Sequence, residues 1–271
     1  MTSWVLLLTL AAALTVEPAV VPVGGLARVA VEGAQPSGTF DGAPLAFFPS
    51  GAAWIALVGI DLDRKPGRYQ IRVTSGGSAS QLDLVVRERP FPVERLTVPR
   101  KYTELDPATL RRVRREQRLL DSLWTRSGGR RLWRGEFVAP ANGPAGSPFG
   151  LRRFFNGEPR SPHAGVDFRA PAGAAVLAAN RGRVALAKSL FFTGNTIVLD
   201  HGLGLFTIYV HLSKMIVGEG AVVDKAAEIG KVGATGRATG PHLHFAVRVG
   251  EARVDPMALL GRPIETADRK Q

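Results

Sequence analysis

Short apolar runs separated by turn residues fill residues 19–90. In the run GRYQIRVTS, Tyr69, Ile71 and Val73 alternate with polar residues, which is the period of a strand with one buried face. LARVAVEG, AAWIALVGID and SQLDLVVRE have similar patterns, and RKPGRY and SGGSAS supply turns between them. We therefore predict an N-terminal immunoglobulin-like β-sandwich over residues 19–90. Because no cluster in it suggests chemistry, its predicted role is that of a spacer or docking domain.

Residues 91–131 have a different pattern, which we interpret as a linker with a basic helix. Prolines interrupt RPFPVERLTVP, whereas LDPATLRRVRREQRLLDSLW has helical spacing. Asp106 suits the N-cap of this helix, and Pro107 suits its first position. The predicted apolar stripe comprises Leu110, Val113, Leu120 and Trp124.

The remaining residues predict a second all-β unit. RGRVALAKS, GNTIVLDHG, LFTIYVHLS and RATGPHLHFAVRV are short runs between glycine-rich turns, with little helical periodicity. We predict an antiparallel β-sheet domain over residues 132–263, followed by a polar tail over residues 264–271. The predicted fold class of the whole chain is all-β.

The amino-acid composition excludes some kinds of site and indicates the charge of a partner. The 271 residues include no cysteine, which excludes disulfides, thiolate metal sites and cysteine nucleophiles. A net charge of +12 favours a polyanionic partner, either nucleic acid, an anionic membrane or an acidic wall polymer. The segment from Arg100 to Arg134 is strongly basic and is the predicted contact with such an envelope surface. The alternative is a solvated helix face with no specific partner.

The first residues indicate export. An apolar stretch runs from Trp4 to Val16 and ends in small residues, although no Lys or Arg precedes it. We interpret residues 1–18 as a secretory signal peptide, cleaved soon after Ala13 or Thr15. The stretch is shorter than the ~20 residues that a transmembrane helix needs. The predicted location is the periplasm or cell envelope, and the alternative is a buried N-terminal strand or helix.

The five histidines all lie within residues 132–263, namely His163, His201, His211, His242 and His244. In SPHAGVDF, His163 and Asp167 are four residues apart, so an extended strand would place them on one face. Binding of one ion by both would require the strand to bend or end there, which Gly165 permits.

Two further segments place imidazoles opposite apolar residues. In PHLHFAV, the leucine, phenylalanine and valine share one face, and His242 and His244 share the other. In FTIYVHLS, the same alternation puts Tyr209 and His211 on the non-core face. Exposed histidines on an ordinary sheet face are the alternative for one such pair. Three segments together favour a metal site gathered on one face.

The residue types suit hydrolysis by a metal ion. Zinc accepts histidine nitrogen and carboxylate oxygen, and catalytic zinc sites keep three protein ligands and an open position. Two non-ligand histidines would serve proton transfer, since the histidine pKa lies near neutrality. Strand position alone does not decide which histidine of HLH is the ligand.

Residues from Leu132 to about Gly261 resemble the lysostaphin-type (LytM-like) zinc endopeptidases, which cut the peptide part of bacterial peptidoglycan. The motifs HxxxD and HxH of that family stand here as HAGVD and HLH, within similar surroundings. The resemblance implies that His163, Asp167 and His244 bind Zn2+, and that His211 and His242 assist catalysis. It further implies an enzyme, a secreted zinc endopeptidase whose substrates are peptidoglycan stem peptides and cross-links, and no nucleic-acid partner.

The residues also fit other functions. The protein could be a non-catalytic peptidoglycan-binding protein or an activator of another wall hydrolase. EGAVVDKAAEIGKVGATG also resembles a lipoyl-carrier hairpin with Lys225 as the modified residue. If the protein were cytoplasmic, its basic segment would suit binding to nucleic acid. His201 follows a strand in a turn and is assigned a structural role. Tyr209 is either a hydrogen-bond donor near the site or a structural residue.

Overall fold

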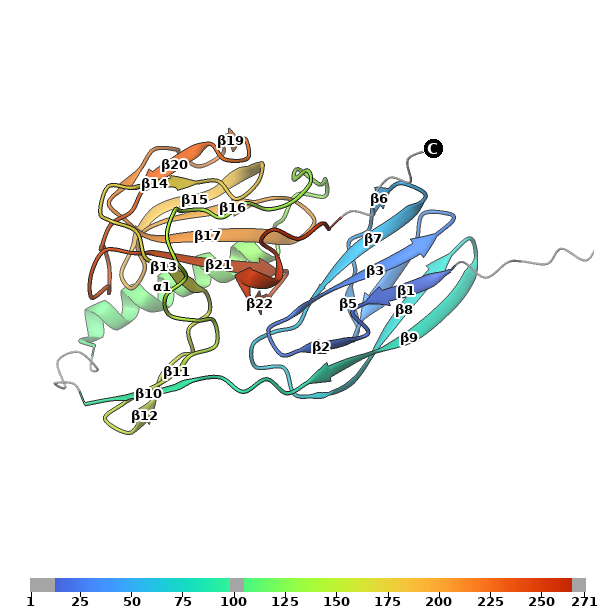
Figure 1. Cartoon of the computed structure of the whole chain (residues 1–271), viewed down its shortest axis with the longest axis horizontal. Coiled ribbons are helices and arrows are strands. Elements are labelled where there is room, and N and C mark those ends of the chain that lie inside the picture. The colour runs from blue at the N-terminus through green and yellow to red at the C-terminus, as the bar shows by residue number, and fades with distance from the viewer. Residues whose placement is uncertain (1–12, 98–104, 265–271) are drawn as a thin grey trace, which may run out of the picture.

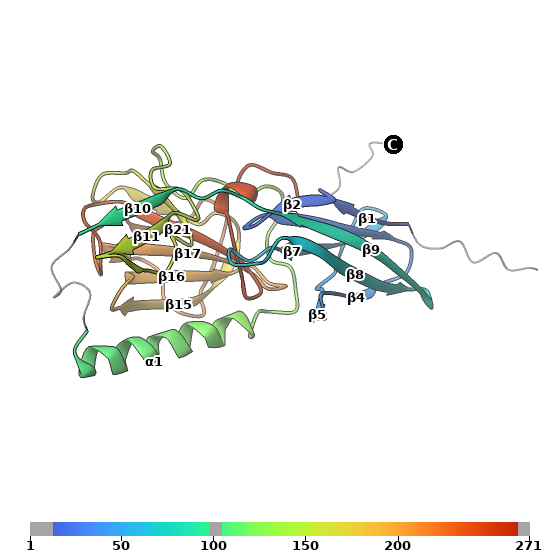
Figure 2. The same cartoon turned by 90° about the horizontal axis from the view of Figure 1, so that it is seen from below.

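The computed structural model describes residues 13–97 and 105–264, which form two β-rich units side by side (Figure 1). One long helix lies against the second unit (Figure 2). The start of the predicted signal peptide, the first residues of the basic segment and nearly all of the polar tail lie outside the described residues. No described helix combines the length and apolar character needed to cross a membrane.

The N-terminal unit is a sandwich of two sheets, in line with its alternating pattern. The sheets have the strand orders β1-β3-β7-β6 and β2-β9-β8-β4-β5. The strands are β1 Leu14–Glu17, β2 Val20–Pro22, β3 Leu26–Glu32, β4 Ser37–Phe40, β5 Ala43–Pro44, β6 Phe48–Ser50, β7 Ala53–Gly59, β8 Gly67–Ser75 and β9 Ser78–Arg87. Val29, Ile71 and Leu84 are fully buried between the sheets.

The strand β1 overlaps the predicted signal peptide. It pairs antiparallel with β3, from Leu14 opposite Val31 to Glu17 opposite Arg28, and an Arg28–Glu17 ion pair of 2.6 Å joins them. Residues 14–17 of the predicted signal peptide thus form an edge strand of the sandwich in this structure. A cleavage after Ala13 would leave this strand whole.

The segment after the sandwich is more ordered than a linker. Its β10 (Val93–Leu96) pairs in parallel with β11 (Arg152–Phe155) of the second unit. The helix α1 (Pro107–Trp124) begins as predicted, because the Asp106 carboxylate accepts hydrogen bonds from the backbone N–H groups of Ala108 and Thr109.

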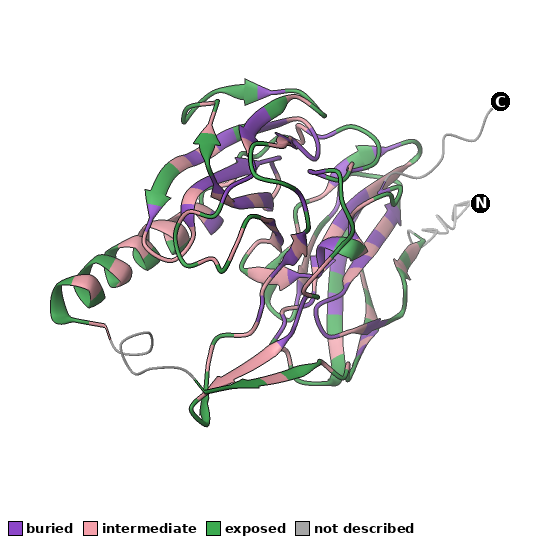
Figure 3. Ribbon diagram, turned by 60° about the vertical axis from the view of Figure 1, so that its left-hand side comes forward, coloured by how far each residue is buried: buried purple, intermediate pink, exposed green. Residues whose placement is uncertain are grey.

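One face of α1 packs on the second unit. Trp124 is buried there, with Leu120 partly buried beside it. The predicted stripe is wrong at Leu110, which is 37% exposed. The opposite face of the helix is open to solvent (Figure 3).

The second unit contains a seven-stranded antiparallel sheet in the order β13-β21-β17-β16-β15-β19, with β22 beside β21. A smaller sheet, β14-β20-β18, packs near it, and β12 pairs with β11. The strands are β12 Glu158–Pro159, β13 Val166–Phe168, β14 Ala175–Leu177, β15 Gly182–Leu190, β16 Gly194–Asp200, β17 Leu205–Leu212, β18 Lys214–Met215, β19 Val222–Val223, β20 Glu228–Lys231, β21 Leu243–Val249 and β22 Ala252–Val254, before the 3-10 helix η2 Pro256–Ala258.

Both faces of the large sheet are covered. Leu243, Phe245 and Tyr209 face a core shared with the small sheet. Phe206 and Val198 face the opposite way, toward Trp124 of α1. The predicted all-β class is confirmed, with α1 as the one long helix among the described residues.

The two units share their core. Phe48, Ile55 and Leu62 of the sandwich belong to the same buried cluster as the second unit, and Phe48 meets the ring of Trp133 edge-on at 5.3 Å between centroids. Arg253 of β22 donates to Asp61 at 2.6 Å, across the interface. The sandwich is thus packed as a fixed part of one body.

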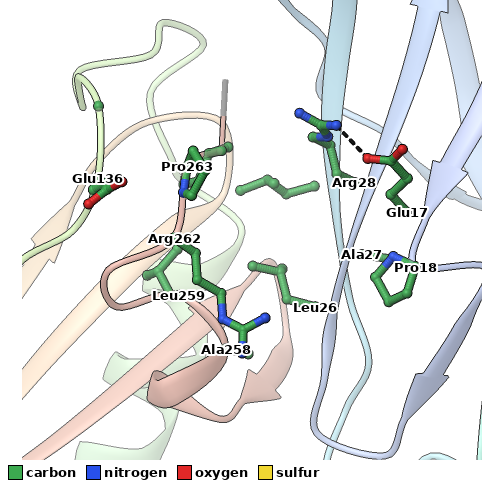
Figure 4. Close-up of a pocket in the computed structure, with 13 residues that line it drawn as sticks. Glu17, Pro18, Leu26, Ala27, Arg28, Glu136, Ala258, Leu259, Arg262 and Pro263 are labelled. Atoms are coloured by element: carbon green, nitrogen blue, oxygen red, sulfur yellow. Dashed lines mark hydrogen bonds and ion pairs between the residues drawn. The ribbon is translucent and has the colours of Figure 1, made fainter. Parts of the chain in front are cut away.

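A cavity of about 810 Å³ lies between the two units (Figure 4). Its lining includes Leu26 and Arg28 of the sandwich and Leu259 of the second unit. It contains none of the histidines, so the candidate chemistry lies elsewhere.

We predict that Phe48→Ala destabilises the whole chain by about 3–5 kcal/mol, the usual cost of such a truncation in a core. Because the core is shared, urea unfolding followed by fluorescence and by circular dichroism should show one coincident transition. Leu96→Ala, at a side chain 41% exposed, is the control and should change stability by less than about 0.5 kcal/mol. Two separate transitions would contradict a shared core.

Candidate metal centre

Strand pairing brings the two sequence motifs together. In the antiparallel ladder of β13 and β21, Asp167 lies directly opposite His244. Opposite residues of such a pair point to the same face, with Cβ atoms about 5 Å apart. The carboxylate of HAGVD and the second histidine of HLH are therefore neighbours because of the sheet register.

His163 reaches this pair from outside the strand. It precedes β13 in an extended segment, where its backbone pairs with Leu151 and Gly150. The chain bends at Gly165, where a Cβ atom would lie 2.4 Å from the carbonyl oxygen of Phe245 and 2.8 Å from the His244 ring. Glycine thus allows the bend that a common site for His163 and Asp167 requires.

Three donor atoms converge on one small space. His163 Nε2 lies 3.0 Å from Asp167 Oδ1 and 2.9 Å from His244 Nδ1. His244 Nδ1 lies 2.9 Å from Asp167 Oδ1. Among the described residues, these three form the group whose ligand atoms could hold a metal ion.

The protonation of His163 shows that this group fits a cation. Its Nδ1 lies 2.9 Å from the carbonyl oxygen of Pro148, to which it can only donate, so its Nε2 presents a lone pair. A carboxylate is acceptor-only, and His244 adds a second imidazole nitrogen at the same point. Lone pairs directed at a common point are stabilised by a positive ion.

The electrostatics favour an ionised carboxylate at the centre of this group. Burial disfavours the charged carboxylate of Asp167, but hydrogen bonds and electrostatic attraction from His163 and His244 outweigh burial and hold its pKa below the ordinary range. Burial lowers the pKa of His244, and burial lowers that of His211 to about 4. At neutral pH Asp167 is therefore a carboxylate, and the His211 and His244 imidazoles are neutral.

His211 reaches the site through a β-bulge. Asn195 pairs with Leu212 and Ile197 with Tyr209, so β17 has one residue more than β16 between these pairs. His211 occupies the bulge with φ of 64°. Its ring lies 6.2 Å from that of His244 between centroids, and its Nδ1 donates to the carbonyl of Thr235 at 2.8 Å.

The bulge corrects the predicted faces of this strand. Tyr209 and His211 do not share a face, because Tyr209 is fully buried in the interior core opposite Phe245. Phe206 and Ile208 instead lie on the face that bears His244 and α1. Alternation fails here because both faces are buried and one residue is inserted.

His242 completes the cluster from the start of β21. Its Nδ1 donates to the carbonyl of Gly240 at 2.9 Å, and its Nε2 lies 3.8 Å from Asp167 Oδ1. Its ring is 4.9 Å from that of His211 between centroids. The structure thus brings together all five predicted site residues, and it leaves the Nε2 atoms of His211 and His242 free of backbone partners.

His201 lies apart from this cluster and is fully buried. Its Nδ1 donates to the carbonyl of Arg181 at 2.8 Å, and its Nε2 accepts from the Thr207 hydroxyl at 2.8 Å. The Thr207 and Tyr209 hydroxyls are 3.0 Å apart, and Tyr209 also accepts from the N–H of Ala179. His201 and Tyr209 therefore form an internal network rather than part of the site.

Both units match models of one protein family. Residues 161–256 match the family model described as Peptidase family M23, and residues 19–89 match the Peptidase family M23 N-terminal domain. The crystal structure of a Pseudomonas aeruginosa protein described as peptidase M23 is 35% identical, with a TM-score of 0.74 over 89% of this chain and 95% of that one. The chain belongs to peptidase family M23.

Curated relatives match part of this M23 protein. Peptidoglycan DD-endopeptidase ShyB of Vibrio cholerae is 43% identical over 96 residues, which are 35% of this chain and 22% of the relative. DD-carboxypeptidase/endopeptidase Mpg of Neisseria meningitidis is 38% identical over 114 residues, 42% of this chain and 26% of the relative. The chain thus spans about a quarter of the length of these relatives.

The family match also bears on Lys225. This residue lies within the matched residues 161–256, and its Nζ is 3.5 Å from the carbonyl of Glu136. The lipoyl-carrier alternative has no support from this match.

Sequence reasoning missed the backbone groups that orient the imidazoles. The carbonyls of Pro148, Thr235 and Gly240 each accept from a histidine Nδ1. A carbonyl has no residue signature, so the sequence holds no signal for them. Thr235 could have been noticed in the ATGRATG turn, where its hydroxyl also joins Asn195 and Leu212.

We predict that the M23 protein loses stability in mild acid because of His201. Burial lowers the folded pKa from 6.5 to about 4, so the folded state binds fewer protons than the unfolded chain in this window. The contribution is fully present above pH 6.5 and falls as pH decreases, by up to ~3 kcal/mol, given ~1.4 kcal/mol per pKa unit.

Urea unfolding at pH 7 and pH 5 measures this loss of stability. His201→Gln should be less stable at pH 7 but should lose less between the two pH values, because its side chain does not titrate. An equal change in the free energy of unfolding between pH 7 and pH 5 in both proteins would show that His201 does not contribute to the acid sensitivity.

Proposed function

We propose that this protein is a zinc-dependent endopeptidase that hydrolyses the peptide cross-links of bacterial peptidoglycan. The observation that carries the proposal is the convergence of His163, Asp167 and His244 within 3.0 Å of one another, beside two further imidazoles. The names of the relatives support this substrate, since ShyB is a peptidoglycan DD-endopeptidase and Mpg a DD-carboxypeptidase/endopeptidase. A protein that only activated another hydrolase would not need all five of these side chains.

Zinc is the metal that best suits this donor set. His163 Nε2, His244 Nδ1 and Asp167 Oδ1 supply two imidazole nitrogens and one carboxylate oxygen, a combination typical of catalytic zinc. When bound, zinc supplies a Lewis acid that polarises a carbonyl and makes water easier to deprotonate. The single negative charge of Asp167 leaves the site able to stabilise further negative charge.

His211 and His242 are placed to transfer protons and to stabilise the negative charge that develops on the substrate. Each donates from Nδ1 to a backbone carbonyl, which fixes the tautomer and leaves the Nε2 lone pair as the free group. Such a nitrogen can take the proton of an attacking water and return it to the leaving amine. Protonated at Nε2, either ring can donate a hydrogen bond to the oxyanion that develops on the scissile carbonyl.

We further propose that the protein is exported and that α1 contacts the anionic envelope surface. The apolar stretch from Trp4 to Val16 supports export. Exposed arginines on the outer face of the helix support the contact, and these are Arg111, Arg114, Arg115 and Arg118. Their positive charge would attract acidic polymers or lipids at low salt.

Digestion of purified peptidoglycan by the zinc-loaded protein tests the enzymatic activity. We expect cross-linked peptides to be cleaved, with the scissile bond identified by the mass of the products. His163→Ala and Asp167→Ala should each lose zinc and activity, because each removes one of three ligands. His211→Ala should keep zinc and lose about 10²–10⁴-fold in turnover, the usual contribution of a general acid–base group.

Tyr209→Phe is the matched control for these variants. Its hydroxyl bonds to Thr207 and Ala179 within the core, so the change should cost stability but leave zinc content and turnover intact. A zinc-free His211→Ala protein would overturn the division of roles. Intact peptidoglycan after digestion with zinc-loaded wild type would refute the enzyme.

Fractionation of cells that produce the protein tests its location. We expect it in the envelope fraction, released by a high-salt wash, with a mature N-terminus at or before Leu14. The strand β1 starts there and pairs with β3, so a later cut would remove an edge of the sandwich. Cytoplasmic protein that retains Met1, or a mature chain that begins after Glu17, would contradict the proposal.

A further inference from the structure

A group of arginines comes from the segments that precede His163 and His242 and has no role in the proposed chemistry. The hairpin of β11 and β12 brings Arg153 and Arg160 together, because the Arg160 N–H donates to the Arg153 carbonyl at 2.9 Å. Arg237 comes from the loop before HLH, where its backbone N–H donates to the carbonyl of Phe192 at 2.8 Å. Three segments distant in sequence thus meet at one place.

Aromatic rings hold two of these guanidinium groups. The Cζ atoms of Arg160 and Arg237 each lie 5.7 Å from the ring centroid of Phe155. The Cζ atom of Arg237 is also 5.3 Å from the centroid of Phe192. Such stacking orients a guanidinium plane and leaves its N–H edge free to donate.

The charge of this group is not balanced within the described residues. Arg153 is paired with Glu94 at 3.0 Å, but no described carboxylate forms an ion pair with Arg160 or Arg237. The Nε atom of Arg160 is buried and has no hydrogen-bond partner. Burial and the neighbouring charges of Arg160 and Arg153 lower the pKa of Arg237. Unpaired like charges of this kind are stabilised when an anion binds between them.

Chain connectivity keeps the backbone of both arginines close to the metal ligands. Arg160 is three residues before His163, so their Cα atoms are at most ~10 Å apart. Arg237 is five residues before His242. A peptide that crosses the metal ligands would then extend toward the arginines.

We propose that Arg160 and Arg237 bind a free carboxylate of the peptide substrate, close to the scissile bond. The inference rests on the proposed function and adds a determinant of specificity to it. The planar fork of arginine matches the two oxygens of a carboxylate, and stem peptides of peptidoglycan carry free carboxylates. An uncharged peptide, such as a chain of glycines, would leave both guanidinium groups unpaired.

The test compares two substrates with the full zinc-loaded chain. One is a cross-linked stem-peptide dimer, and the other is the same dimer with its free carboxylates amidated. For wild type we expect amidation to lower kcat/KM by about 10- to 100-fold, which corresponds to the strength of charged hydrogen bonds. In R160Q/R237Q the free dimer should lose a similar factor, and amidation should have little further effect.

Two variants separate charge recognition from a structural effect. R68Q changes an exposed arginine of the sandwich and should behave like wild type. R237K keeps the charge without the fork and should recover part of the loss seen in R237Q. Zinc content and circular dichroism should be unchanged in all four variants.

Binding of both dimers to the inactive His211→Ala protein, measured by calorimetry, separates this inference from the proposed function. If wild type cleaves nothing but His211→Ala prefers the free dimer, the enzyme proposal fails and the carboxylate site stands. Equal handling of both dimers by wild type, or equal binding by His211→Ala, overturns the carboxylate site.

Discussion

The contact among His163, Asp167 and His244 is the constraint around which the second unit is arranged. Three electron-pair donors within 3.0 Å of one another would repel without a cation, so the surrounding structure must hold them in place. The β13–β21 register sets Asp167 opposite His244, and Gly165 lets the chain bend so that His163 can join them. The Pro148 carbonyl then fixes the tautomer of His163.

One face of the large sheet packs on α1 at one end and carries residues of the metal centre at the other. Phe206, opposite Arg248, lies where the face packs on Trp124 of α1, and Val210, opposite His244, lies where it reaches the metal centre. The helix covers the apolar part of this face, which would otherwise be exposed to water. The bulge at His211 adds an imidazole to the uncovered part without disturbing the interior core on the other face.

The sandwich is tied to the site by packing and by a strand. Phe48 and Ile55 share the core of the second unit, so the sandwich cannot separate without exposing apolar surface. Beyond it, β10 pairs with β11, the strand that carries Arg153, and Glu94 of β10 pairs with that arginine. The N-terminal unit therefore helps to position the hairpin that leads into His163.

The sequence alone determined the local elements and the identity of the chemical groups. Alternation at Ile71 and Val73 indicated strands, and Asp106 marked the start of the helix, because these patterns act over a few residues. The histidines and Asp167 stood out as donors because apolar residues alternate with them. Long-range packing set which faces meet: β1 pairs within the sandwich, Tyr209 points inward, and His211 points outward through one inserted residue. Ladder register, bulges and arginine clusters arise from contacts distant in sequence, which local periodicity does not encode.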